Sequence, residues 1–466
     1  MKKRVLQSQI LSTSFQAALY IIIFLTFFLP LSITNPQIIN MSRTAAITMA
    51  TFGVVLFILT NVYGGYSLGI NKARSVFFSI LISVVMTDIV AYLQLQIMNV
   101  NRYNNPHLIL FGEDFLLFII SVALQTAFIY LFVKLGYFFY FKINPPERCC
   151  IISSSQEQAD HIAEKIGTFV QKYELCDVLH YNCEDLYETI NDYDVVFLSG
   201  IPDTEEARIK GYCYKHGKSM YLLAELEDVI VSASAQVVID DAPFLYTRRV
   251  EPSLTQRFLK RVMDIVISAA GILLLSPLMI AAAIAIATTS KGPVFYRQER
   301  ATINGRVFRI IKFRTMYDQA DTQAESASEN DTRITKPGRI LRKYRIDELP
   351  QLFNVLIGDM SVVGPRPEML ENVDRYTREV PEFEYRNQMK AGLTGQAQID
   401  GKYNTSPKDK IILDLLYIEQ FSLSLDIKLM LRTLTVFFRH DSTEGFQARK
   451  KHRTMPMRTQ ARNRDH

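Results

Sequence analysis

Four long apolar runs in the N-terminal third of this 466-residue chain restrict the folds open to it. A helix rises about 1.5 Å per residue and the hydrocarbon layer of a bilayer is about 30 Å thick, so each run is long enough to cross it. The first run lacks a small-residue cleavage site and is followed by three similar runs, which argues against a removable signal peptide. The sequence therefore predicts a four-helix transmembrane domain over residues 1–145. The predicted spans cover about residues 15–34, 45–63, 75–98 and 115–141.

The distribution of basic residues in this domain predicts its orientation. Seven of them fall on one side of the predicted topology: Lys2, Lys3, Arg4, Lys72, Arg74, Lys142 and Arg148. The opposite loops offer only Arg43 and Arg102. Because loops rich in lysine and arginine stay on the cytoplasmic side, the chain after residue 142 is expected to begin in the cytosol. Within the third run, Asp88 is an intramembrane carboxylate, which indicates either an ion or substrate path or an interhelical hydrogen bond.

Residues 146–248 have the pattern of a soluble α/β domain. Short apolar runs alternate with polar helical stretches, which is typical of a Rossmann-like fold. The first strand leads into Ser153-Ser154-Ser155-Gln156, where a dinucleotide-binding turn would need glycines. The domain is therefore either a structural or regulatory module, or a nucleotide site that uses serine hydroxyls. All five cysteines lie between residues 149 and 213 without metal-ligand spacing, so we expect reduced thiols.

A fifth apolar segment, residues 262–289, is not expected to cross the membrane. Lys260 and Arg261 precede it and Lys291 follows it, so both ends carry the charge of cytosolic flanks. Ser276 and Pro277 lie at its centre, where proline removes a helix hydrogen bond and bends the axis. We therefore predict a re-entrant helix with a structural kink at this pair, whose freed carbonyls are met by Ser276 or by neighbouring protein. An ordinary kinked fifth span is the alternative.

Asp347 and Glu348 are adjacent carboxylates set between basic residues in the run from residue 344 to 352. Such a pair in a domain that starts with an apolar segment favours phosphate chemistry at a membrane. Taken alone, the pair also fits a solvated helix start or a salt bridge with Arg345. The net charge of +5 is modest, and the basic residues crowd the apolar boundaries and the C-terminal tail. This distribution favours anionic lipid as a partner and predicts no nucleic-acid binding.

Five further motifs follow the Ser276-Pro277 pair within residues 257–439. They are Gly292-Pro293-Val294-Phe295-Tyr296-Arg297-Gln298, Lys312-Phe313-Arg314-Thr315-Met316, Asp347-Glu348-Leu349-Pro350-Gln351, Gly358-Asp359-Met360-Ser361 and Val363-Gly364-Pro365-Arg366-Pro367. In this order they resemble the bacterial sugar transferases of the monotopic phosphoglycosyl transferase superfamily, in their long polyprenyl-phosphate hexose-1-phosphate transferase form. The N-terminal spans and the middle domain resemble the accessory modules of that family by architecture.

The resemblance implies the reaction. Hexose-1-phosphate would pass from a UDP-sugar to undecaprenyl phosphate with release of UMP, as the priming step of exopolysaccharide, capsule or O-antigen assembly. By resemblance, Asp347 is the nucleophile that forms a covalent phosphosugar intermediate, and Glu348 is a Mg²⁺ ligand. Spacing alone does not distinguish the two roles. The implied location is the bacterial inner membrane, with the catalytic domain on the cytoplasmic face and a homodimer left open.

The resemblance also implies that basic residues bind the donor and acceptor phosphates. Lys312, Arg314, Arg342 and Arg366 match positions of the family associated with phosphate and substrate binding, and the planar fork of arginine meets phosphate oxygens bidentately. The chain departs from the family pattern at two positions. Thr302 stands where glycine is common, and Gln396 stands where tryptophan is common. The second change puts in doubt a stacking or anchoring role for that position.

These expectations combine into one architecture, a membrane protein of α plus α/β class. A four-helix domain and a Rossmann-like domain precede an α-rich catalytic domain at residues 249–445, which starts with the re-entrant helix, and residues 446–466 form a basic disordered tail. Two other functions stay open. One is a non-catalytic membrane scaffold, and the other is a pyrophosphatase that acts on nucleotide sugars and releases free sugar phosphate without a lipid acceptor.

Overall fold

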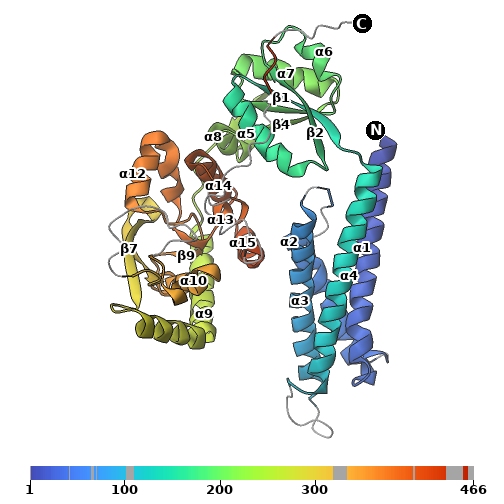
Figure 1. Ribbon diagram of the computed structural model, residues 1–466, viewed down its shortest axis with the longest axis vertical. Helices are drawn as coiled ribbons and strands as arrows, with labels where there is room; N and C mark the ends of the chain where they lie inside the picture. Colours follow the sequence, from blue (N-terminus) through green and yellow to red (C-terminus); the bar gives the residue numbers. More distant parts are fainter. Residues whose placement is uncertain are drawn as a thin grey trace. The chain divides into compact units, whose positions relative to one another are not determined.

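The computed structural model describes residues 2–40, 42–64, 68–69, 71–100, 110–317, 333–401, 405–436 and 455–459 (Figure 1). The chain divides into two compact units. Met1–Leu223 and Lys450–His466 form the first, and Ala224–Arg449 form the second. Helix α8 (Leu226–Ser232) belongs to the second unit, because its Val229 is buried in that unit's core.

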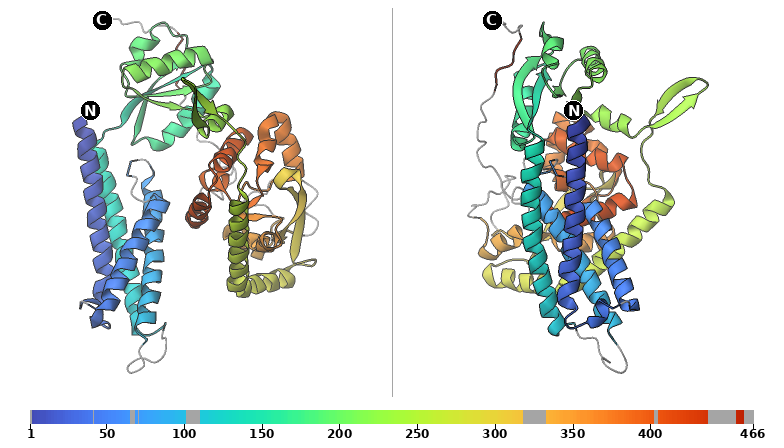
Figure 2. Two further views of the ribbon diagram at one scale, coloured as in Figure 1. Left: turned by 180° about the vertical axis from the view of Figure 1, so that it is seen from behind. Right: turned by 90° about the vertical axis from the view of Figure 1, so that its right-hand side faces the viewer.

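The first unit begins with four long helices (Figure 2). They are α1 (Lys2–Leu31), α2 (Arg43–Tyr63), α3 (Ala73–Met98) and α4 (Glu113–Ile143). Phe27 and Phe52 are fully buried among them, whereas Phe57 and Phe138 are each more than 60% exposed. Length and composition make these helices and α9 (Leu254–Thr289) five candidate membrane spans. Large apolar side chains on the outer surface are expected where lipid replaces water, so this is the architecture of a membrane protein.

Asp88 on α3 is fully buried in the helical bundle. Its Oδ1 accepts a hydrogen bond from the Gln125 amide of α4 at 3.3 Å. The same amide nitrogen donates to the carbonyl oxygen of Ile23 on α1 at 3.1 Å. Of the two roles we left open for Asp88, the structure therefore supports the interhelical hydrogen bond.

The middle part of the first unit is an α/β fold built on a four-stranded parallel sheet with strand order β2-β1-β3-β4. Its elements are β1 (Glu147–Ser153), α5 (Gln156–Ile166), β2 (Tyr173–His180), α6 (Leu186–Ile190), β3 (Val195–Ser199), α7 (Asp203–Lys215) and β4 (Ser219–Leu222). Apolar residues of β1 and β3 are buried on both faces of the sheet, as expected of inner parallel strands. The predicted β/α alternation is confirmed here.

The serine hydroxyls of the turn after β1 form hydrogen bonds within the turn and with the start of α5. Ser155 begins α5 as its N-cap, accepting a hydrogen bond from the backbone N–H of Gln158. The hydroxyls of Ser153 and Ser154 both donate to Oε1 of Gln158, at 3.3 and 3.2 Å. These contacts favour the structural or regulatory interpretation of the domain over a nucleotide site. The five cysteines are free thiols, and all except Cys176 are buried.

The prediction of a disordered tail is wrong for residues 455–459. This segment lies along β2, and Arg458 forms a parallel bridge with Leu179. A charged composition suggested disorder, but an open strand edge offers backbone partners that composition does not reveal. The basic residues Lys450, Lys451, Arg453 and Arg462 of the same prediction lie outside the described residues.

The second unit combines helices with three short two-stranded sheets. Besides α8 and α9, its elements are β5 (Ala235–Ile239), β6 (Ala242–Tyr246), β7 (Phe295–Ala301), β8 (Val307–Phe313), α10 (Lys336–Lys343), the 3-10 turn η4 (Ile346–Glu348), α11 (Gln351–Ile357), β9 (Ser361–Val363), α12 (Leu370–Glu379), η5 (Pro381–Gln388), β10 (Gly392–Thr394), α13 (Gln396–Asp400), α14 (Pro407–Glu419) and α15 (Leu423–Val436). Its core gathers Val355 and Val363 with Ile411, Leu415 and Ile418 of α14. The apolar face of α14 is therefore a core face.

Helix α9 bends sharply into two arms, which Figure 2 shows from two sides. Pro277 lies inside this helix and frees the carbonyl of Leu273 four residues earlier. The Ser276 hydroxyl donates to that carbonyl at 2.8 Å, which confirms the predicted role of Ser276. Leu273 and Leu274, just before the proline, are both 79% exposed. The bend thus presents apolar side chains outward from the second unit.

Candidate active site

The turn that carries Asp347 and Glu348 rests on the second arm of α9. Arg345 adopts a left-handed conformation with φ of 54°, and the 3-10 turn η4 follows it immediately. The flanking apolar residues Ile346 and Leu349 pack against a buried cluster that includes Met279 and Ile286 of α9. The left-handed backbone conformation costs free energy for a residue other than glycine. Such conformations persist where the surrounding structure enforces them, and they are common at functional sites. The adjacent carboxylates are therefore held directly on the bent apolar helix.

Glu348 is the centre of a cluster of cations. Its Oε1 lies 2.8 Å from Nζ of Lys312 and 3.2 Å from Nη2 of Arg366. Although burial opposes ionisation, these two cations and Arg345 hold the pKa of Glu348 well below its usual range. The charge of Glu348 in turn raises the pKa of Arg366. Glu348 is consequently a permanent carboxylate, and the side chain of Arg366, 43% exposed, remains accessible to a ligand.

Asp347 has the opposite electrostatic environment. Burial and the neighbouring charge of Glu348 raise its pKa to about 6, although Lys312 and Arg342 act in the opposite direction. Arg342 is itself oriented by a hydrogen bond from its Nε to Oγ1 of Thr315, at 2.8 Å. Two adjacent carboxylates with pKa values pushed apart are a common sign of divided chemical roles.

The loop with Arg366 is fixed by close backbone packing. It follows β9, which pairs in parallel with β10 through Ser361 opposite Gly392 and Val363 opposite Thr394. A Cβ on Gly364 would lie 2.2 Å from the carbonyl oxygen of Lys390, and one on Gly392 would lie 2.1 Å from the nitrogen of Gly364. Only glycine permits this approach. The glycines next to Arg366 therefore act by holding its loop against β10.

Sequence reasoning missed a buried ionic network beneath this loop. Arg386 donates to the carbonyl oxygen of Arg366 at 2.8 Å and lies 2.7 Å from Oδ2 of Asp414. Glu368, in the same loop, lies 3.3 Å from Nζ of Lys410. These residues come from η5 and α14, far from the recognised motifs in sequence, so spacing gave no signal for them. They position the backbone of the Arg366 loop.

Arg300 was also missed, although it lies two residues beyond a recognised motif. It is only 8% exposed and donates to Oε1 of Gln298 at 2.6 Å. It lines a pocket together with Lys312, Glu348, Gln351 and Arg366. Burial and the proximity of Arg366 lower the pKa of Arg300. The pocket therefore gathers three cations around one carboxylate, which suits an anionic ligand.

Arg314, which was predicted to bind substrate, and Thr302, which departs from the family pattern, both form hydrogen bonds with the backbone. Arg314 donates from Nη2 to the carbonyl and hydroxyl oxygens of Ser290, at 2.9 and 2.8 Å, and so caps the C-terminal end of α9. Thr302 is 1% exposed, and its hydroxyl accepts from the N–H of Ala391 and donates to the carbonyl of Asp359. Threonine at this position thus satisfies backbone groups that glycine would leave to other partners.

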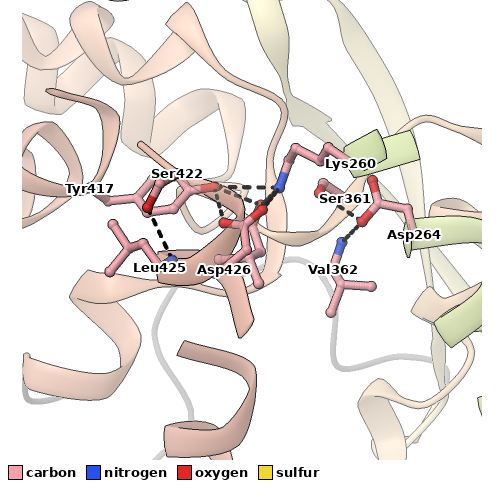
Figure 3. Close-up of polar contacts among 9 residues, drawn as sticks. Lys260, Asp264, Ser361, Val362, Tyr417, Ser422, Leu425 and Asp426 are labelled. Carbon is pink, nitrogen blue, oxygen red and sulfur yellow. Dashed lines mark hydrogen bonds and ion pairs between the residues drawn. The ribbon is translucent and has the colours of Figure 1, made fainter. Parts of the chain in front are cut away.

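The first arm of α9 contacts β9, the strand that leads into the Arg366 loop (Figure 3). Lys260 pairs with Asp426 at 2.6 Å and donates to the carbonyl oxygen of Val363 at 2.9 Å. One turn later, Oδ1 of Asp264 accepts from the Ser361 hydroxyl and the Val362 N–H, both at 2.9 Å. The groups of β9 in these hydrogen bonds are the Ser361 hydroxyl, the Val362 N–H and the Val363 carbonyl, and β9 leads directly into the Arg366 loop. Lys260 and Asp264 therefore position that loop relative to the apolar helix.

The two carboxylates offer oxygen ligands for a metal ion. Among the described residues, no cluster of three or more histidine, cysteine, aspartate or glutamate side chains could hold a metal. Mg²⁺, however, commonly binds through one or two carboxylates and completes its shell with water and substrate phosphates. Asp347 and the ionised Glu348 fit this mode, because they are adjacent hard oxygen donors beside a cationic pocket.

The similarity of this chain to known proteins lies within the second unit. A model of the bacterial sugar transferase family matches residues 255–440. The UDP-N-acetylgalactosamine-undecaprenyl-phosphate N-acetylgalactosaminephosphotransferase of Aeromonas hydrophila is 43% identical over 202 residues, which are 42% of this chain and 47% of that protein. The UDP-glucose:undecaprenyl-phosphate glucose-1-phosphate transferase of Caulobacter vibrioides is 44% identical over 181 residues, 38% of this chain and 68% of that protein.

The same similarity extends to a longer relative. The UDP-glucose:undecaprenyl-phosphate glucose-1-phosphate transferase of Escherichia coli is 40% identical over 187 residues, 39% of this chain and 40% of that protein. The match thus spans less than half the length of the Aeromonas and Escherichia proteins and about two thirds of the Caulobacter protein. In each case the shared segment accounts for about two fifths of this chain.

Proposed function

The chain belongs to the bacterial sugar transferase family, and from this premise we propose that it transfers a hexose-1-phosphate from a UDP-sugar to undecaprenyl phosphate. The observation that carries the proposal is the pair of adjacent carboxylates with opposite pKa shifts beside a cationic pocket. The names of the relatives support both the donor and the lipid acceptor. The transfer would initiate assembly of a surface polysaccharide at the inner membrane.

We assign the nucleophile to Asp347. A carboxylate oxygen of Asp347 would attack the β-phosphorus of the UDP-sugar, and the bond from that phosphorus to the bridging oxygen would break, releasing UMP. An oxygen of undecaprenyl phosphate would then attack the same phosphorus, free Asp347 and form undecaprenyl-diphosphate-sugar. Covalent catalysis of this kind divides one transfer between two anions into two steps. The raised pKa of Asp347 supports the assignment, because a more basic carboxylate is a better nucleophile than its neighbour.

The cations beside Asp347 would offset the charge of the phosphates. Lys312 and Arg366 already contact Glu348, and Arg342 lies near Asp347. Arginine suits phosphate because two of its N–H groups meet two oxygens. We propose that Glu348, with Asp347 beside it, holds Mg²⁺, which when bound would neutralise diphosphate charge. Arg314 was predicted to bind substrate as well, and its buried Nε and Nη1 have no protein partner among the described residues.

We propose that α9 enters and leaves one face of the membrane without crossing it. Its first arm is fixed to β9 by Asp264 and to the C-terminal end of α11 by Arg261, which donates to the carbonyls of Val355 and Leu356 at 2.7 Å. Its second arm is fixed to the same unit through Ile286 and the cap at Ser290. A straight span could not keep both ends on one folded unit. This arrangement supports a cytoplasmic catalytic domain.

Cysteine accessibility tests this topology. In a background without native cysteines, Thr255→Cys and Lys291→Cys should react with a membrane-impermeant maleimide from the same side, because both positions are exposed ends of α9. The label should reach both in inverted inner-membrane vesicles and neither in intact spheroplasts. Gly112→Cys, at the start of α4, serves as the control for the opposite side. Labelling of positions 255 and 291 from opposite sides would contradict the re-entrant helix.

The pH dependence of the first step follows from the pKa of Asp347. Since the ionised form is the nucleophile and its pKa is about 6, the rate of UMP release should fall about tenfold per pH unit well below pH 6. A single turnover without acceptor isolates this step from titration of the lipid phosphate. Protein held at pH 5 and returned to pH 7.5 should recover full activity. A rate unchanged between pH 7.5 and pH 5 would contradict Asp347 as the titrating nucleophile.

The experiment that tests the function is a donor panel. Purified protein with Mg²⁺ and undecaprenyl phosphate is offered UDP-glucose, UDP-galactose and their N-acetyl forms, and UMP release is measured with and without the acceptor. We expect sustained, acceptor-dependent release from one donor. Sustained release of free sugar phosphate without acceptor would instead support the pyrophosphatase alternative. No release from any donor would support a non-catalytic scaffold.

A further inference from the structure

The middle domain has an open sheet edge that the catalytic proposal does not use. The strand order β2-β1-β3-β4 leaves β2 at one edge of the sheet. Residues 455–459 lie along this edge. The His180 N–H donates to the carbonyl of Arg458 at 2.9 Å, and the Arg458 N–H donates to the carbonyl of Val178 at 2.8 Å. The segment therefore adds one parallel β-bridge to the open edge of the sheet, between Arg458 and Leu179.

The side chain of Gln156 on α5 forms hydrogen bonds with the backbone of the same segment on both sides of Pro456. Pro456 has no N–H, so it cannot take part in a regular ladder. The Gln156 amide bridges this position, because its Nε2 donates to the Met455 carbonyl at 3.0 Å and its Oε1 accepts from the Met457 N–H at 2.7 Å. The Met457 side chain packs against the buried cluster that includes Ile151. The site thus matches both the backbone and one apolar side chain of the segment.

A third contact of the segment is the ion pair between Arg458 and Asp185. Nη2 of Arg458 lies 3.3 Å from Oδ2 of Asp185 and donates to the Thr189 hydroxyl at 3.0 Å. Asp185 immediately precedes α6 and Thr189 lies within it. Both side chains of the ion pair are only about one fifth exposed, 21% for Arg458 and 20% for Asp185. A half-buried carboxylate at this place favours a basic residue one position after the partly buried Met457.

We propose that the β2 edge, α5 and α6 of the middle domain form a binding site for an extended peptide, filled by the chain's own C-terminal segment. Backbone hydrogen bonds would supply affinity, and the Met457 and Arg458 side chains would supply selectivity. The last described residue before this segment is Val436, and residues 437–454 lie between the two in sequence. The occupant of the site is therefore the C-terminal segment of the same chain.

Hydrogen exchange on the full-length protein tests the contact directly. The backbone N–H of His180 and that of Arg458 should exchange slowly in the wild type, because each donates to the other segment. Arg458→Glu and Asp185→Lys should each speed exchange of both segments by about tenfold, as expected for loss of a partly buried ion pair. The double variant Asp185→Lys with Arg458→Glu should restore protection. Arg208→Glu makes the same charge change at an exposed side chain of α7 and should leave exchange of both segments unchanged.

A second measurement tests the site in trans. A chain that ends at residue 449 should bind a fluorescent peptide of residues 452–463 saturably, and Asp185→Lys in that chain should weaken binding about tenfold. The wild type should not bind the peptide, because its site is filled. Equal binding by both chains, or unprotected tail amides in the wild type, would overturn the proposal. Dimers that form only with the tail present would overturn the assignment of the occupant to the same chain, because the occupant would then be a second copy.

Discussion

Replacing Asp347 with asparagine is expected to abolish UMP release and covalent labelling by a nucleotide sugar, with a loss of about 10⁴-fold or more. The amide keeps the shape of the carboxylate but has no anionic oxygen to attack phosphorus. Incubation with a UDP-sugar radiolabelled in the β-phosphate, followed by denaturation, would detect the intermediate on the wild type. Asp374→Asn removes one exposed carboxylate of α12 and should retain both activities. Normal turnover by Asp347→Asn would refute the assignment.

The same substitution should stabilise the folded protein. The pKa of Asp347 is raised from 3.8 to about 6 on folding, so the folded state binds its proton more tightly than the unfolded state. Ionised Asp347 therefore destabilises the fold above about pH 4, and this cost is complete above about pH 6. Removing the charge should raise the free energy of unfolding by about 1 to 3 kcal/mol at pH 7.5. Thermal unfolding of both variants in one detergent at pH 7.5 and pH 4 measures the difference, which should vanish at the lower pH.

The recognised motifs contain the residues that the structure brings together around Glu348. Asp347 and Glu348 lie together on η4, and Lys312 and Arg366 meet at Glu348 although more than fifty residues separate them in sequence. Ser276 satisfies the carbonyl of Leu273, as local helix geometry required. Predictions of this kind depend on short-range stereochemistry or on a recognised pattern, and both are present in the sequence itself.

The supporting contacts could not be predicted because they join segments distant in sequence. Arg386 and Asp414 meet beneath the Arg366 loop, and nothing in the spacing of either residue marks it as a partner of the other. Lys260 was interpreted as a cytosolic flank of an apolar segment, whereas the structure buries it to 8% exposure. A charge at the edge of an apolar run has the same sequence signature whether it faces water or a buried carboxylate.

The tertiary contacts of the C-terminal tail could not be predicted from its sequence either. Its composition indicated disorder, yet Arg458 meets Asp185 and the backbone of β2. The unit to which α8 belongs is equally hidden from the sequence. Helix α8 follows β4 closely in sequence, but its buried Val229 belongs to the core of the second unit. Which core an amphipathic helix joins is decided by tertiary packing, and amphipathic periodicity is the same in either case.

Lys260→Met is expected to destabilise the second unit by about 3 to 5 kcal/mol, because it leaves a buried carboxylate without its cation. Asp426 is fully buried, and its remaining partner is the Tyr417 hydroxyl, which donates to Oδ1 at 2.8 Å. Burial already raises the pKa of Asp426 in spite of Lys260. Without the lysine, the pKa of the Asp426 carboxyl should rise further, so the destabilisation should be larger at pH 8 than at pH 6. Thermal unfolding at these two pH values measures both effects.

The double variant Lys260→Met with Asp426→Leu separates stability from positioning. Replacing a buried ion pair with apolar side chains of similar volume is commonly neutral for stability, so most of the lost stability should return. The hydrogen bond from Lys260 to the Val363 carbonyl would still be absent, and β9 leads directly into the Arg366 loop. UMP release should therefore remain well below wild type although the fold is restored. Arg257→Met, on the exposed side of α9 one turn earlier, should change stability by less than about 0.5 kcal/mol and leave activity intact. Full activity in the double variant would show that Lys260 acts only in stability, and that the membrane helix positions Arg366 through Asp264 alone.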